Sequence, residues 1–83
     1  MQKNRQLKLI WDFRGPDAEP IAKHHEIHLK EYFQIESKEH FGIGVETLSI
    51  MHSIAYVIVL ETEMKTVRDA LKPHRGVVHA VKD

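Results

Sequence analysis

Residues 54–60 have the sequence IAYVIVL, the longest uninterrupted apolar stretch of the chain, and its pattern indicates the type of fold. Side chains of a β-strand alternate between the two faces of a sheet, so a strand that is apolar throughout needs a cover on both faces. The stretch has the length of a strand and is far shorter than the ~18 apolar residues of a membrane-spanning helix. It therefore predicts a central strand in a layered domain.

Three other segments have the pattern of strands. Residues 7–13, LKLIWDF, place large apolar side chains at alternate positions, which predicts a strand with one buried face. Residues 41–45, FGIGV, alternate in the same way. Beyond them the apolar phase shifts to Leu48 and Ile50, as a β-bulge would cause. Residues 76–81, GVVHAV, predict a short last strand.

Two helices are predicted between these strands. The segment from Ala18 to Glu36 has apolar residues at helical spacing, and Asp17 before it is a good N-cap residue. A second helix is predicted over Glu63–Lys72, with Thr62 as its N-cap and Pro73 as its stop. Helices and strands thus alternate along the chain in the order β-α-β-β-α-β.

This order is that of the ferredoxin-like α+β sandwich, in which two helices cover one face of a four-stranded antiparallel sheet. Residues 1–83 form one domain of this kind, because no linker or low-complexity tract divides them. The polar segment MQKNRQ, residues 1–6, is expected to be disordered and to precede the first strand.

The second face of such a sheet has no helices on it. We expect Ile10 and one apolar set of the central strand, Ala55, Val57 and Val59, to lie on this open face. Because a large apolar face is rarely left in water, these residues predict an interface between copies of the chain, or a small-molecule pocket at that interface.

Histidine is the most distinctive residue type, with three copies in AKHHEIHLKEY, residues 22–32. At about 100° per residue, His25 falls in the apolar stripe of the first helix, which predicts a neutral, hydrogen-bonded core histidine. His24 and His28 are one turn apart and share their stripe with Glu31. This spacing can hold zinc, nickel or copper, but it is more typical of a solvated helix boundary.

The composition excludes several classes of function. The chain contains no cysteine, so disulfides, thiolate catalysis and cysteine-based metal sites are excluded. Its formal net charge is zero, which makes nucleic acid an unexpected partner. The N-terminal MQKNRQLKLIW lacks the apolar segment of a secretory signal, and we expect a cytoplasmic protein without a membrane-spanning segment.

With this element order, the chain resembles small ACT-like regulatory domains of the ferredoxin-like class. Its second half, residues 38–80, is similar to the C-terminal domain of nickel-responsive transcriptional regulators. The residues that carry the resemblance are VETL (45–48), VIVL (57–60) and RGVVH (75–79). The family's nickel ligands are not retained: SIMH (49–52) stands where the family has a His-x-His pair, and its cysteine is missing. The resemblance implies a regulatory architecture that self-associates.

These observations predict a non-enzymatic binding or regulatory domain that self-associates through its sheet, and they leave a small-molecule ligand open. One alternative is a transition-metal-binding protein, with zinc or nickel on His24, His28 and Glu31. Another is a small dimeric α+β-barrel enzyme in which His25 or His79 carries a proton. The sequence alone does not decide among the three.

Overall fold

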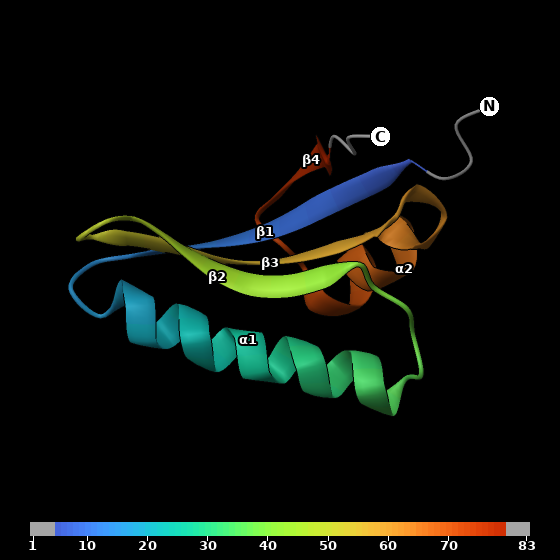
Figure 1. Cartoon of the computed structure of the whole chain (residues 1–83), viewed down its shortest axis with the longest axis horizontal. Helices are drawn as coiled ribbons and strands as arrows, with labels where there is room; N and C mark the ends of the chain where they lie inside the picture. Colours follow the sequence, from blue (N-terminus) through green and yellow to red (C-terminus); the bar gives the residue numbers. More distant parts are fainter. Residues whose placement is uncertain (1–4, 80–83) are drawn as a thin grey trace.

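The computed structural model describes residues 5–79, so the expectations for residues 1–4, 80 and 81 lie outside it. The described chain forms six elements in the predicted order (Figure 1). They are β1 (Gln6–Arg14), α1 (Ala18–Ile35), β2 (Gly42–Ser49), β3 (His52–Leu60), α2 (Glu61–Leu71) and β4 (Arg75–His79). Neither helix in this part of the chain is long and apolar enough to cross a membrane.

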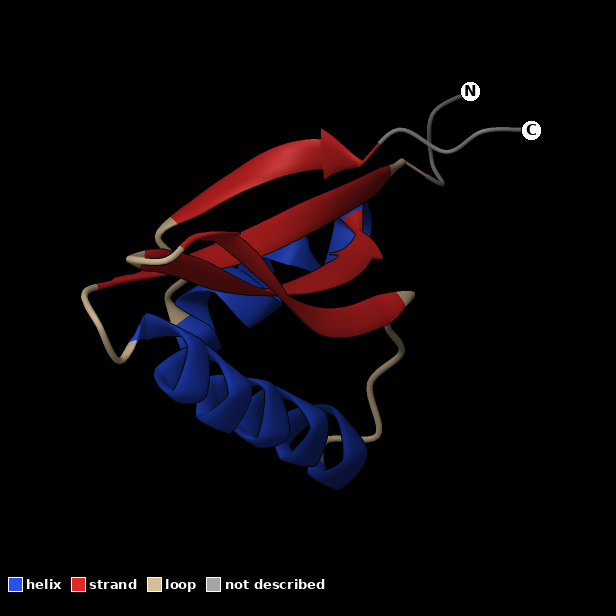
Figure 2. Cartoon of the chain, turned by 60° about the vertical axis from the view of Figure 1, so that its left-hand side comes forward, coloured by secondary structure: helices blue, strands red, loops and turns tan. Residues whose placement is uncertain are grey.

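The strands form one antiparallel sheet in the order β2-β3-β1-β4. The two long strands β1 and β3 occupy its centre, as the apolar stretch at 54–60 predicted. Both helices lie on the same side of the sheet, as Figure 2 shows, and α1 runs along its length. The prediction of a ferredoxin-like α+β fold is therefore confirmed.

The hydrophobic core lies between the sheet and the helices. Its buried members come from β1, β3 and both helices: Leu9, Trp11, Ala22, Leu29, Phe33, Ala55, Val57, Val59 and Val67. The indole Nε1 of Trp11 donates a hydrogen bond of 3.1 Å to the carbonyl of Leu71 at the last residue of α2. This bond fixes the end of α2 against the central strand and satisfies the one polar atom of the tryptophan.

The register between β1 and β3 corrects one sequence-based expectation. Trp11 pairs with Ala55, Leu9 with Val57, and Leu7 with Val59. Directly paired residues of adjacent strands point to the same face, so Ala55, Val57 and Val59 lie beneath the helices. The prediction that these three residues lie on the open face is therefore wrong.

The open face instead carries Ile10, as expected, together with Ile54 and Ile58. These three side chains are only 3–8% exposed although no helix covers them. Long polar side chains flank them on the same face: the Lys8 ammonium lies 4.3 Å from the ring centroid of Tyr56. The apolar side chains on this face are therefore few, and their neighbours in the same chain already cover them.

The hairpin between β2 and β3 contains the predicted bulge. Thr47 pairs with Ser53 and Ser49 pairs with His52, which leaves Leu48 as the extra residue. The turn consists of Ile50 and Met51, so it begins one residue before the predicted position at residues 51–53 and overlaps it at Met51. This bulge reverses the apolar phase at the end of β2.

Most ends of the elements differ from the prediction by one or two residues, but β2 continues to Ser49, four residues beyond the predicted strand. Gln6, expected to be disordered, is the first residue of β1 because it pairs with Leu60 and His79. Asp17 occupies the N-cap position of α1, but its side chain makes no capping hydrogen bond. Thr62 is not the N-cap of α2: the helix begins at Glu61, whose N–H donates to the carbonyl of Arg5. Helix α2 ends at Leu71, one residue before the predicted end, because Lys72 is left-handed, and Pro73 follows as the predicted stop.

Candidate functional site

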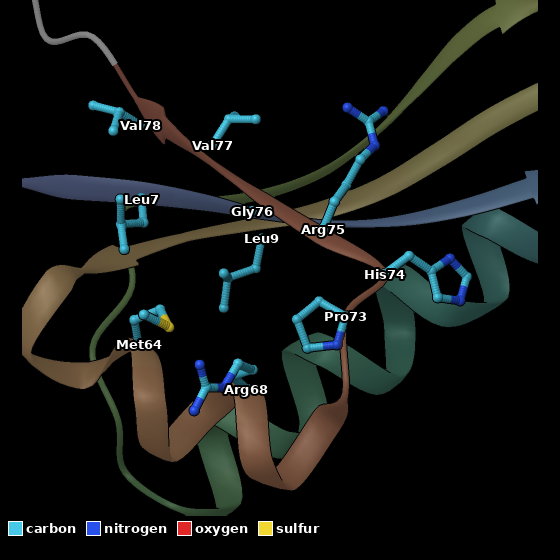
Figure 3. Close-up of a pocket in the computed structure, with 10 residues that line it drawn as sticks. All are labelled: Leu7, Leu9, Met64, Arg68, Pro73, His74, Arg75, Gly76, Val77 and Val78. Atoms are coloured by element: carbon cyan, nitrogen blue, oxygen red, sulfur yellow. The ribbon is translucent and has the colours of Figure 1, made fainter.

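A groove lies between the edge strand β4 and helix α2. We call it the β4–α2 groove, and its volume is about 370 Å³. Figure 3 shows Leu7 and Leu9 pointing from β1 toward Met64 and Arg68 on α2. The remaining lining comes from the α2–β4 connection and from β4: Pro73, His74, Arg75, Gly76, Val77 and Val78.

The groove exists because the sheet is wider than the layer of helices. Helix α2 packs on β1 and β3, the two central strands. On β4, the residues that face the helices are Gly76, opposite Leu9, and Val78, opposite Leu7. A Cβ added at Gly76 would lie 3.2 Å from Cδ2 of Leu9, so the glycine allows Leu9 to pack directly against the backbone of β4.

The lining of the groove is apolar with one cation turned toward it. Arg68 lies on α2 beside Met64, at the helix side of the groove (Figure 3). Its Nε is 3.4 Å from Oδ1 of the neighbouring Asp69, an exposed ion pair of small energetic value. Arg75 contributes its backbone, while its side chain turns to the open face of the sheet (Figure 3).

On that open face, Asp12 holds together two segments that are far apart in sequence. Its carboxylate accepts hydrogen bonds from Arg75 Nε at 2.9 Å and Nη2 at 3.2 Å. Oδ1 also lies 2.8 Å from Nε2 of His52. The hydrogen bond from Arg75, followed by that from His52, lowers the pKa of Asp12 from 3.8 to about 2. The ionised carboxylate of Asp12 thus links β1 to His52 on β3 and to Arg75 on β4, and we call these three residues the Asp12 anchor.

His74 completes this attachment of β4. The ring Nδ1 of His74 accepts a hydrogen bond of 2.8 Å from the backbone N–H of Asp12. The backbone N–H of His74 donates to the carbonyl of Ile10. The ring therefore extends the β1–β4 ladder one step beyond Arg75. Together with the ion pair of Asp12, this contact fixes the position of the strand that forms one wall of the groove.

The Asp12 anchor gives a prediction for stability. A carboxylate with a lowered pKa in the folded state contributes stability above about pH 4, and this contribution is lost as pH falls through about 2. Since Asp12 is partly solvent-accessible, we expect Asp12→Asn to lower the free energy of unfolding by roughly 1–2 kcal/mol at neutral pH. Urea denaturation at a series of pH values measures this.

The difference between wild type and Asp12→Asn should shrink below about pH 4, whereas Asp17→Asn should show no such convergence. Parallel curves for wild type and Asp12→Asn would contradict the assignment.

The structure separates the histidines of α1 as the helical spacing predicted. His25 lies against the sheet, with ring centroids 4.8 Å from Trp11 and 5.6 Å from Phe13. Its Nε2 is buried and has no hydrogen-bond partner within the described chain, so the hydrogen bond predicted for this histidine is not found at this atom. Burial, and then the nearby His28, lower the pKa of His25. His25 is therefore a neutral histidine of the core boundary.

His24 and His28 lie on the exposed side of α1. Their Nε2 atoms are 2.9 Å apart and the rings meet edge to face. The carboxylate of Glu31 does not lie beside the two Nε2 atoms. It is 3.6 Å from Nδ1 of His28, on the other side of that ring. Within residues 5–79, no group of three or more histidine, aspartate or glutamate side chains is arranged to hold a metal ion.

The other histidines are dispersed in the structure. His40 packs edge-on against Phe33, with ring centroids 5.3 Å apart, and His79 pairs with Gln6 at the end of β4. Neither reaches the pair on α1 or the buried Nε2 of His25 in the described structure. The structure thus brings together His24 and His28 alone among the predicted metal ligands.

Sequence reasoning missed the β4–α2 groove and the Asp12 anchor. Asp12 is separated from His52 by 40 residues and from Arg75 by 63. Only the strand pairing brings them together. A weak signal was present at Gly76, since a glycine within a strand marks a place where a side chain is missing from a face.

Comparisons of the chain with protein-family models, with curated proteins and with solved structures find no match.

Proposed function

We propose that the protein is a non-enzymatic binding module whose β4–α2 groove takes a small carboxylic acid with an apolar tail. The observation that carries this proposal is an apolar groove of about 370 Å³ with a single arginine, Arg68, turned toward it. Small-molecule sites are mostly apolar clefts of about 300–1,000 Å³ with a few polar groups that fix the orientation of the ligand.

The apolar part of the ligand is accommodated by side chains from three elements. Leu7 and Leu9 form the floor, Met64 forms one side, and Val78 forms the other. Met64 is flexible and adapts to the shape of a ligand more readily than a branched side chain. Each methylene removed from water contributes about 0.8 kcal/mol, so a short alkyl chain gives most of the affinity.

The charged part of the ligand is chosen by Arg68. A guanidinium binds a carboxylate through two parallel hydrogen bonds, and this geometry favours a planar carboxylate over an alcohol or an amine. Arg75 does not compete for the ligand, because its guanidinium is engaged by Asp12 on the other face of the sheet. The groove is therefore selective for an anionic head at its α2 side.

The experiment is an NMR titration with octanoate, octan-1-ol and octylamine as probes. We expect octanoate to shift the methyl signals of Leu7, Leu9, Met64 and Val78, with weaker binding of the alcohol and the amine. Arg68→Gln should raise the dissociation constant for octanoate about tenfold, which corresponds to about 1.4 kcal/mol. Gly76→Val, which fills the wall, should prevent binding.

Two matched variants control the experiment. Arg14→Gln removes an exposed arginine at the far end of β1, and Gly42→Ala adds a Cβ with only an ordinary contact of 3.7 Å to Ile58. Both should bind octanoate as wild type does. If octanoate shifts none of the groove methyls, or if Arg68→Gln binds it as tightly as wild type does, the proposed function is wrong.

A further inference from the structure

The exposed pair of His24 and His28 is the second feature of this protein with the geometry of a binding site. We propose that this pair binds a divalent transition-metal ion such as zinc, and that the same pair of a second copy completes the site. This site lies on α1 and is independent of the β4–α2 groove.

The two histidines are already close to the geometry of metal ligands. Their Nε2 atoms are 2.9 Å apart and share a hydrogen bond, so one of the two nitrogens carries the proton between them. Two imidazole nitrogens bound to one tetrahedral zinc ion, at about 2.0–2.1 Å each, lie about 3.3 Å apart. Loss of the shared proton, or its transfer to Nδ1, together with a rotation of the rings would let both nitrogens bind one ion. Both side chains come from one rigid helix, so little conformational entropy is lost on binding.

Glu31 has a different role from the one that its spacing predicts. Its carboxylate faces Nδ1 of His28, the ring nitrogen that points away from His24. At 3.6 Å this contact is longer than a hydrogen bond, but a small movement of the carboxylate would let it accept the Nδ1 proton and leave the lone pair of Nε2 for the ion. Glu31 is thus a positioning residue for His28 and not a metal ligand.

The site is incomplete within one chain. Zinc in structural sites takes four protein ligands, and the described chain provides two at this point without a third nearby. The surface around the pair is suited to a second copy: Ile21 and Ile27 lie on either side of it on the helix and are 48% and 53% exposed. A two-fold axis through the ion would bring two such surfaces together and supply all four nitrogens.

The test measures zinc binding and mass together. Sedimentation equilibrium with zinc chloride should show a dimer with one zinc ion per two chains, and a chelator should return it to the lighter species. Competition with a chromophoric chelator gives the affinity. His24→Ala and His28→Ala should each abolish both effects, whereas His40→Ala, a change at another exposed histidine, should leave them unchanged.

Two further variants separate the parts of the proposal. Glu31→Gln should weaken zinc binding about tenfold with the stoichiometry retained, while Glu19→Gln, which removes the partner of Lys23 on the same helix, should not. Ile27→Asp should prevent dimer formation. One zinc ion per chain without a change in mass overturns the role of the second copy. Zinc binding that is equal in wild type and His24→Ala overturns the site.

Discussion

Val57→Asp should abolish the folded state at neutral pH. The Val57 side chain is 0% exposed and lies at the centre of the core, opposite Leu9 and beneath the helices. Burying an aspartate there without a partner costs several kcal/mol, and a small domain has only about 5–15 kcal/mol of stability. The expected result is a far-ultraviolet circular dichroism spectrum without helical signal and no cooperative thermal transition.

The matched control is Val77→Asp. Val77 is also a valine in a strand of the same sheet, but it is 42% exposed on β4 and lies on the open face. We expect this variant to melt cooperatively, with a change in free energy within about 1 kcal/mol of wild type. If Val57→Asp melted like Val77→Asp, the placement of Val57 beneath the helices would be wrong.

Trp11→Ala should have the next largest effect, a loss of about 3–5 kcal/mol of unfolding free energy. Two contributions add up: the cavity left by the indole, and the loss of the hydrogen bond from Nε1 to the carbonyl of Leu71. Trp11→Phe removes the hydrogen bond and a smaller volume, so we expect a loss of about 1–2 kcal/mol. Urea denaturation followed by circular dichroism measures both.

Tryptophan fluorescence provides a second measurement, because the chain has one tryptophan. The emission of wild type should be that of a buried indole and should shift to longer wavelength in the same urea transition as the helical signal. Phe41→Ala, a change at a half-exposed aromatic residue, is the control and should cost less than about 1 kcal/mol. A loss below about 1 kcal/mol for Trp11→Ala would contradict the assigned core.

The position of Ala55, Val57 and Val59 beneath the helices changes which surface is expected to contact a second copy of the chain. Ala55, Val57 and Val59 were expected at an interface, but an interface through them would require the helices to leave the sheet. Ile10 does lie on the open face, where it is largely covered by its neighbours. The surface proposed here for a second copy is instead the exposed side of α1, around His24 and His28.

The local pattern of the sequence determined the elements and their order. Period-two and helical spacing depend on side chains within a few residues of one another, so they can be found without knowledge of the fold. The same spacing placed His25 in the core and His24 with His28 outside it, and the structure agrees. The element order then left the ferredoxin-like arrangement as the expected fold, which the structure confirms.

The tertiary structure alone decided which face of IAYVIVL lies under the helices. Both faces of this strand are apolar, so periodicity cannot distinguish them, and a shift of one residue in the register exchanges them. The register is fixed by the β2–β3 turn, by the bulge at Leu48 and by the pairing with β1. The Asp12 anchor and the β4–α2 groove depend on the same pairing, because their residues come from segments that only the sheet brings together.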